Sequence, residues 1–100
     1  MFRQVVMSRW AEDVSPEAKQ AFRDALEALR AIPELLAMTF GEDAGIFEDN
    51  CDFVAVQDFA DFASARRYVE HPLHQTYVRE HASKVIGHRF VVQHEWTAPA

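Results

Sequence analysis

The sequence predicts an α+β fold in which two helices cover one face of a four-stranded antiparallel sheet. Three observations lead to this prediction. Residues 2–10, 53–59 and 88–96 each divide into two alternating sets of side chains, as β-strands do, and a fourth strand is expected at about 35–41. Two other stretches repeat apolar residues every three or four positions, which is typical of amphipathic helices. The resulting order of elements is strand, helix, strand, strand, helix, strand.

Composition narrows the class of protein. The chain has 100 residues, ten Lys and Arg against sixteen Asp and Glu, a net charge of −6 and 49% hydrophobic residues. We expect one domain over residues 1–97 and a disordered tail at 98–100, because this composition is that of a globular chain. No apolar run approaches the ~20 residues of a membrane helix, and the acidic balance argues against nucleic acid as a partner. No secretory signal is visible, so we expect a cytoplasmic location.

The first helix is expected to begin at Ser15-Pro16-Glu17. Ser15 is a suitable N-cap, and Pro16 is tolerated at the first helical position because an N–H there has no intrahelical partner. Pro33 should end the helix, since the residue before a proline avoids helical backbone angles. The apolar positions of this helix are Ala18, Phe22, Ala25, Leu26 and Leu29.

The second helix is expected after a polar loop at 42–52 and the strand at 53–59. Asp61 should cap it and His71-Pro72 should break it, with a further helical segment over about 73–85 that Gly87 closes. Its expected apolar positions are Phe62, Ala65 and Val69, with Tyr68 close by.

This order is the split βαβ, or ferredoxin-like, arrangement, and it leaves one sheet face without helices. The first and last strands carry apolar residues on both sides, too many for a solvated face. We therefore expect a homodimer in which two sheets pack face to face. The apolar residues on which this expectation rests are Phe2, Val6, Phe90, Val92 and Trp96 on one side, opposite Val5, Met7 and Val91.

Several segments together resemble the stress-responsive A/B barrel domain (Dabb) family. They are residues 2–7, 13–17, 58–59, the Tyr-Val-Glu-His-Pro-Leu-His-Gln run at 68–75, and 88–92. The His-Pro-x-His step at 71–74 is the most specific of them. The resemblance implies the dimeric α/β barrel fold. It leaves activity open, because most members have no assigned activity and several plant members are stress-associated.

One branch of this family, that of olivetolic acid cyclase, closes a linear polyketide by aldol condensation without a cofactor. The resemblance carries its acid–base pair onto Tyr68 and His74. Two further cavity histidines of that branch are replaced here, by Gln4 and Phe53. We therefore take Tyr68 and His74 as candidate catalytic residues. Candidate ligand-binding residues are Gln4, Phe53, Tyr68, His71 and His74.

Three functional hypotheses follow for the expected cavity between helices and sheet. In the first, the cavity holds a small hydrophobic or aromatic ligand. In the second, Tyr68 and His74 make the protein a cofactor-independent polyketide cyclase or lyase. In the third, the dimer is purely structural and its own side chains fill the cavity. A neutral imidazole suits proton abstraction next to a carbonyl. In the structural alternative, the Tyr68 ring packs on the sheet and His74 caps a turn or bonds a carbonyl.

Metal and cofactor sites are not expected. His71, His74 and His81 have partly helical spacing, but Pro72 interrupts it and no carboxylate completes a metal motif. Cys51 is a single thiol in a polar loop with no adjacent base, so we expect it to be inert. With three glycines in all, a phosphate-binding or dinucleotide-binding loop is implausible.

Overall fold

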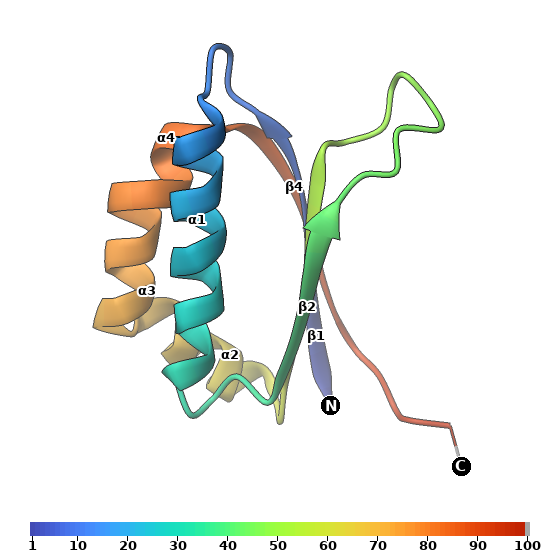
Figure 1. Cartoon of the computed structure of the whole chain (residues 1–100). Helices are drawn as coiled ribbons and strands as arrows, with labels where there is room; N and C mark the ends of the chain where they lie inside the picture. The colour runs from blue at the N-terminus through green and yellow to red at the C-terminus, as the bar shows by residue number, and fades with distance from the viewer. Residues whose placement is uncertain (100) are drawn as a thin grey trace.

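The structure, a computed structural model that describes residues 1–99, has a four-stranded antiparallel sheet with every helix on one face (Figure 1). The strands are β1 (Phe2–Trp10), β2 (Ala37–Glu42), β3 (Phe53–Phe59) and β4 (Ile86–Glu95), in the spatial order β2-β3-β1-β4. The helices are α1 (Pro16–Ala28), α2 (Phe62–Glu70), α3 (Pro72–Tyr77) and α4 (Ser83–Val85). A 3₁₀ turn at Leu29–Ala31 follows α1, and a π turn at Val78–Ala82 joins α3 to α4. The predicted α+β, ferredoxin-like fold is confirmed.

Helix α1 begins where the sequence predicts. The Ser15 side chain accepts a hydrogen bond of 3.1 Å from the Ala18 backbone N–H, and Pro16 is the first helical residue. The helix tightens into the 3₁₀ turn before Pro33, and Leu35 is still part of a turn because its N–H bonds to the Ile32 carbonyl. Strand β2 therefore begins at residue 37 and not at 35.

Helix α2 is capped as predicted, but it buries a different face. The Asp61 carboxylate accepts from the Ser64 N–H at 2.7 Å. Ser64, Ala65 and Tyr68 form the buried face, since Tyr68 follows Ser64 by four residues and Ala65 by three and therefore lies on the same side of the helix. Of the apolar positions expected for this helix, Ala65 is buried, whereas Phe62 and Val69 are exposed.

Gly87 was predicted to end the last helical segment, but it is the second residue of β4. A Cβ atom at this position would lie 3.0 Å from the Trp10 carbonyl oxygen and 3.1 Å from the Ala11 Cα. The pairing of β1 with β4 shifts register between Arg9 and Trp10, and the backbones come so close here that a Cβ would be tightly packed. Glycine is favoured here by this close approach.

The strand register corrects the predicted grouping of side chains on the sheet. Residues that are Cα partners across an antiparallel pair point to the same face. Val5 is paired with Val92, and Val6 with Val91. Val92 therefore lies on the outer face beside Val5, and Val91 lies on the helix side beside Val6. The expectation that Val92 shares a face with Val6 was wrong.

The helices pack over β3, β1 and β2, and leave β4 uncovered. The core contains the fully buried Phe22, Leu29, Ile32, Phe59 and Tyr68. Every residue of β4 after Ile86 is exposed. The space between the helical layer and the sheet is therefore open to solvent along β4. None of the helices in residues 1–99 is long and apolar enough to cross a membrane.

The chain after β4 runs on without helix or strand through Pro99. It is attached by Trp96, whose N–H bonds to the Met1 carbonyl at 3.0 Å. The predicted tail at 98–100 ends at Ala100, which lies outside the described residues.

Candidate functional site

A cavity of about 430 Å³ lies between the helical layer and the sheet, on the β4 side. Strand alternation brings Gln4, Val6 and Ser8 of β1 onto its floor, beside Phe53, Ala55 and Gln57 of β3. Helix α1 adds Phe22 and Leu26, helix α3 adds His74 and Tyr77, and strand β4 adds Arg89. A groove next to it shares Gln4, Val6, His74, Val78 and Arg89, so the cavity is open toward the uncovered strand.

A chain of side-chain amides crosses the floor of the cavity. The Gln93 amide donates to the Gln4 oxygen, the Gln4 amide donates to Gln57 at 2.8 Å, and the Gln57 amide donates to the Tyr68 phenol oxygen at 2.9 Å. Gln4 is the Cα partner of both Gln57 and Gln93, which places the three amides side by side. The chain runs from the exposed strand β4 to a phenol in the core.

His74 projects from α3 into both the cavity and the groove. Burial lowers the pKa of its imidazole below the usual value, and a hydrogen bond with the backbone of Val69 acts in the opposite direction. Such a bond raises a histidine pKa when the ring N–H donates, so its acceptor is the Val69 carbonyl at the end of α2. The imidazole is therefore neutral near pH 7, with its other nitrogen available as an acceptor or base.

Tyr68 lies behind the cavity surface. Its side chain is fully buried, its ring packs on Phe59 with centroids 5.0 Å apart, and its ring centroid is 4.7 Å from that of His74. Burial raises the pKa of the phenol well above its usual value, and the bond from Gln57 offsets this in part. The phenol therefore stays neutral over the physiological pH range.

The structure brings most of the predicted site residues together. Gln4, Phe53 and His74 line the cavity, and Tyr68 contacts His74 from behind. His71 is separate from them: its Nδ1 accepts from the Leu73 N–H at 3.0 Å and caps α3, and it lines neither the cavity nor the groove.

The cavity residues that were not singled out from the sequence include Ser8, Gln57, Tyr77 and Arg89. Ser8 and Gln57 share the strand faces of Gln4 and Phe53, so alternation along each strand could have found them. Tyr77 lies one helical turn after His74, and its ring centroid is 5.6 Å from the imidazole. Arg89 depends on the pairing of β1 with β4, which no local pattern gives.

The histidines do not form a metal-binding cluster. Within residues 1–99, no three His, Cys, Asp or Glu side chains are placed to hold one ion.

The outer face of the sheet is a second candidate surface. Its middle is apolar, with Val5, Met7, Val56, Phe90 and Val92 on three neighbouring strands, and Val92 is 57% exposed. This surface is called the outer apolar face below.

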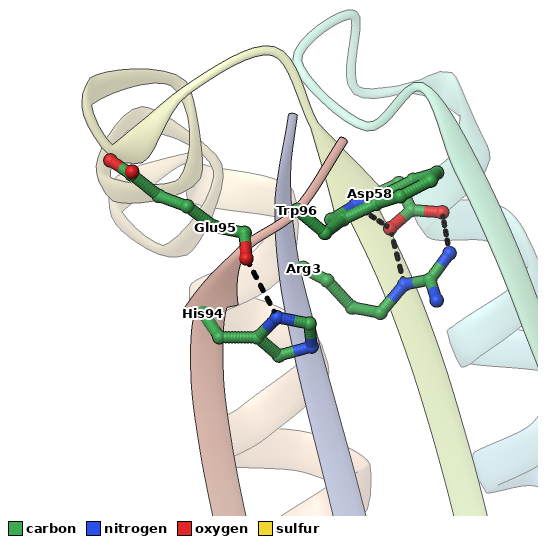
Figure 2. A network of polar contacts seen from close by, with 5 residues as sticks. All are labelled: Arg3, Asp58, His94, Glu95 and Trp96. Atoms are coloured by element: carbon green, nitrogen blue, oxygen red, sulfur yellow. Dashed lines mark hydrogen bonds and ion pairs between the residues drawn. The ribbon is translucent and has the colours of Figure 1, made fainter. Parts of the chain in front are cut away.

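A polar network borders the outer apolar face at one end of the strands (Figure 2). The Arg3 guanidinium donates to both carboxylate oxygens of Asp58, at 2.8 and 3.0 Å, and the Trp96 indole N–H donates to the same carboxylate at 3.2 Å. The guanidinium carbon also lies 4.2 Å from the centre of the Trp96 ring. Arg3 holds the pKa of Asp58 below its usual value, chiefly by hydrogen bonding, so this end of the face is charged.

Solved structures with the same fold cover almost the whole chain. A dimeric ferredoxin-like protein of unknown function from Thermobifida fusca is 31% identical, with a TM-score of 0.86 over 95% of this chain and 90% of that one. A Dabb family protein from Mesorhizobium loti is 21% identical, with a TM-score of 0.80 over 97% of each chain. A hydroxynitrile lyase from Passiflora edulis is 18% identical, with a TM-score of 0.84 over 98% of this chain and 96% of that one.

A comparison with curated proteins found no match. The family model described as the stress responsive A/B barrel domain matches residues 2–95. This match spans all four strands and every helix, and the chain therefore belongs to the stress responsive A/B barrel domain (Dabb) family.

Proposed function

We propose that the protein is a homodimer that binds a small hydrophobic or aromatic molecule in the cavity of each subunit. The observation that carries this proposal is the cavity itself. Its volume of about 430 Å³ is within the range of small-molecule sites, roughly 300–1,000 Å³. Phe22, Leu26 and Phe53 offer an apolar wall, while Gln4 and His74 offer a few polar contacts. A cytoplasmic location stays our expectation from the sequence.

The outer apolar face supports the dimer. A single subunit would leave Phe90 at 44% and Val92 at 57% exposed in the middle of a flat sheet, and a second copy packed on this face would remove both from water. The relative from Thermobifida fusca, 31% identical to this chain, is described as dimeric. The Arg3–Asp58 pair borders the apolar residues, as the polar rim of an interface does.

A second candidate is a cofactor-independent cyclase or lyase, and the neutral imidazole of His74 favours it. A base of this kind can take a proton from a carbon next to a carbonyl, and a phenol can polarise the carbonyl oxygen. The fold also occurs in the Passiflora edulis hydroxynitrile lyase, although the low identity makes that a likeness of fold. We favour binding because Tyr68 is fully buried and does not line the cavity, so the acid partner has no direct path to a ligand.

The test combines binding and turnover. The wild type is titrated with naphthalene-2-carboxamide and followed by ¹H–¹⁵N NMR, and it is assayed for cleavage of mandelonitrile and for cyclisation of a linear polyketone. Binding predicts shifts at cavity residues and no turnover above a buffer blank. His74→Ala should weaken binding by about fivefold, equivalent to one hydrogen bond of about 1 kcal/mol. His81→Ala is the matched control, because His81 lines neither the cavity nor the groove.

Each other result points to a different function. Turnover that disappears in His74→Ala and persists in His81→Ala would establish the enzyme. Absence of binding by any small apolar probe would favour the structural dimer whose own side chains fill the space.

A further inference from the structure

Arg89 differs from every other arginine of the chain in having no partner within residues 1–99. Of the eight arginines in the sequence, six are in ion pairs and Arg9 donates to the carbonyl oxygens of Asp49 and Asn50. No carboxylate of the described residues lies within 4.0 Å of Arg89, and the guanidinium makes no hydrogen bond there. In a chain of net charge −6, an arginine that meets neither a carboxylate nor a carbonyl oxygen is unexpected.

This free cation lies over the cavity. Arg89 is the Cα partner of Ser8, so both side chains point to the helix side of the sheet, and both line the cavity. Its charge contributes to lowering the pKa of His74 and acts in the same direction on Tyr77, which places the guanidinium near the two rings that form the helical wall.

Neither the cavity nor the adjoining groove is lined by Asp or Glu among the described residues, although the chain has sixteen of them. His74 is neutral near pH 7, and Arg89 is the only Arg, Lys, Asp or Glu among the described residues that line the cavity. Ser8 adds a hydroxyl beside it that has no side-chain hydrogen bond within residues 1–99.

Resting on the proposed binding function, we propose that the ligand is a small monocarboxylate with an aromatic or aliphatic body. Its carboxylate pairs with the Arg89 guanidinium, whose planar fork matches the two oxygens, and it accepts a further bond from the Ser8 hydroxyl. The apolar body lies against Phe22 and Phe53, away from the open side. One guanidinium balances one negative charge, which favours a monocarboxylate over a more highly charged anion.

The test compares matched acids and amides. Dissociation constants are measured by isothermal titration calorimetry for naphthalene-2-carboxylate and naphthalene-2-carboxamide, and for hexanoate and hexanamide. The wild type should bind each acid about tenfold more tightly than its amide. In Arg89→Gln this preference should vanish, so that each acid and its matched amide bind with about equal affinity. Arg89 is exposed on an uncovered strand, so the variant should fold, which its circular dichroism spectrum and thermal midpoint check.

Arg66→Gln is the matched control, because Arg66 is an exposed arginine of α2 that pairs with Glu70 and lines neither the cavity nor the groove. It should keep the wild-type preference. Added salt should weaken binding of the acids and leave the amides unaffected.

The outcomes separate the two proposals. If the wild type binds acid and amide equally, or Arg89→Gln keeps the preference, the carboxylate inference is overturned and the binding function stands. If no acid or amide binds the wild type, the binding function and this inference fall together.

Discussion

The phenol oxygen of Tyr68 accepts a hydrogen bond of 2.9 Å from the side-chain amide of Gln57. This bond fixes the direction of the phenol, because an oxygen that accepts from Gln57 has its own O–H free to donate elsewhere. Since burial raises the pKa of Tyr68, the phenol is a neutral hydrogen-bond donor over the pH range of the cell. The Gln57 oxygen in turn accepts from Gln4, so a cavity residue and a core phenol are linked through one amide.

The Gln57–Tyr68 bond should contribute measurably to stability. Tyr68→Phe keeps the ring packing but leaves the buried Gln57 amide without its oxygen acceptor, which should lower the free energy of unfolding by about 1–3 kcal/mol. Gln57→Leu should also destabilise the protein. The double variant should be less destabilised than the sum of the two, because neither partner is then left unpaired. Urea denaturation of the four proteins measures this coupling, and strictly additive effects would show that the bond contributes nothing.

The dimer can be tested with two neighbouring valines on opposite faces of β4. Val92→Asp puts a carboxylate in the middle of the outer apolar face, where packing of a second sheet would bury it unpaired at a cost of several kcal/mol. We expect this variant to be a monomer of 11.5 kDa by light scattering at micromolar concentration, and the wild type to have twice that mass.

Val91→Asp is the control for this experiment. Val91 lies on the helix side beside Val6 and lines the groove, so an aspartate there stays in contact with water. This variant should remain a dimer. A wild type of monomer mass, or equal dissociation by both substitutions, would contradict the face-to-face arrangement.

The Ser15 cap of α1 should act on stability alone. Ser15→Ala removes the acceptor for the Ala18 N–H and should cost about 1 kcal/mol, or roughly 4–8 °C in thermal midpoint for a domain of this size. Ser15→Asp keeps an acceptor at the cap and should restore most of the loss. Ligand affinity should stay unchanged in both, since Ser15 lines neither the cavity nor the groove. A midpoint for Ser15→Ala equal to that of the wild type would mean that the cap contributes nothing.

Local signals predicted the elements of this fold well. The Ser15 and Asp61 caps and the strands at 2–10 and 53–59 are where the sequence places them, because capping and alternation depend on residues close in the chain. The errors concern long-range pairing. Which face Val92 occupies depends on its register with Val5, 87 positions away in the chain, and the position of Gly87 depends on its close approach to Trp10.

The same contrast between local signals and long-range pairing applies to the residues of the candidate site. The resemblance to the family paired Tyr68 with His74 by their expected roles, and the structure brings their rings into contact. Arg89 and Gln93 could not be assigned to the site from β4 alone, because they reach it only through the pairing of β4 with β1. His71 was grouped with His74 because the two share one short motif, but the Pro72 backbone turns His71 into the cap of α3.

The buried imidazole of His74 gives a prediction on pH. Because burial lowers its pKa in the folded protein, the unfolded chain, with an ordinary pKa of about 6.5, binds a proton more readily. Above that pH the ring is neutral in both states. As the pH falls from about 6.5 toward the lower folded pKa, the unfolded state alone gains a proton, so the free energy of unfolding decreases.

This loss should be specific to His74. Urea denaturation between about pH 8 and pH 5 covers the titration of an ordinary histidine, and His74→Gln should lose less stability than the wild type over that interval because it has no proton to gain at this position. An NMR titration of the wild-type His74 ring should give a pKa below 6.5. A carboxylate ligand held by Arg89 would place a negative charge near the ring and raise the pKa of His74. The same titration with naphthalene-2-carboxylate bound should therefore give a higher pKa. With naphthalene-2-carboxamide the pKa should stay unchanged. A free-protein pKa at or above 6.5 would contradict the buried, neutral imidazole on which both the binding and the base hypotheses for His74 depend.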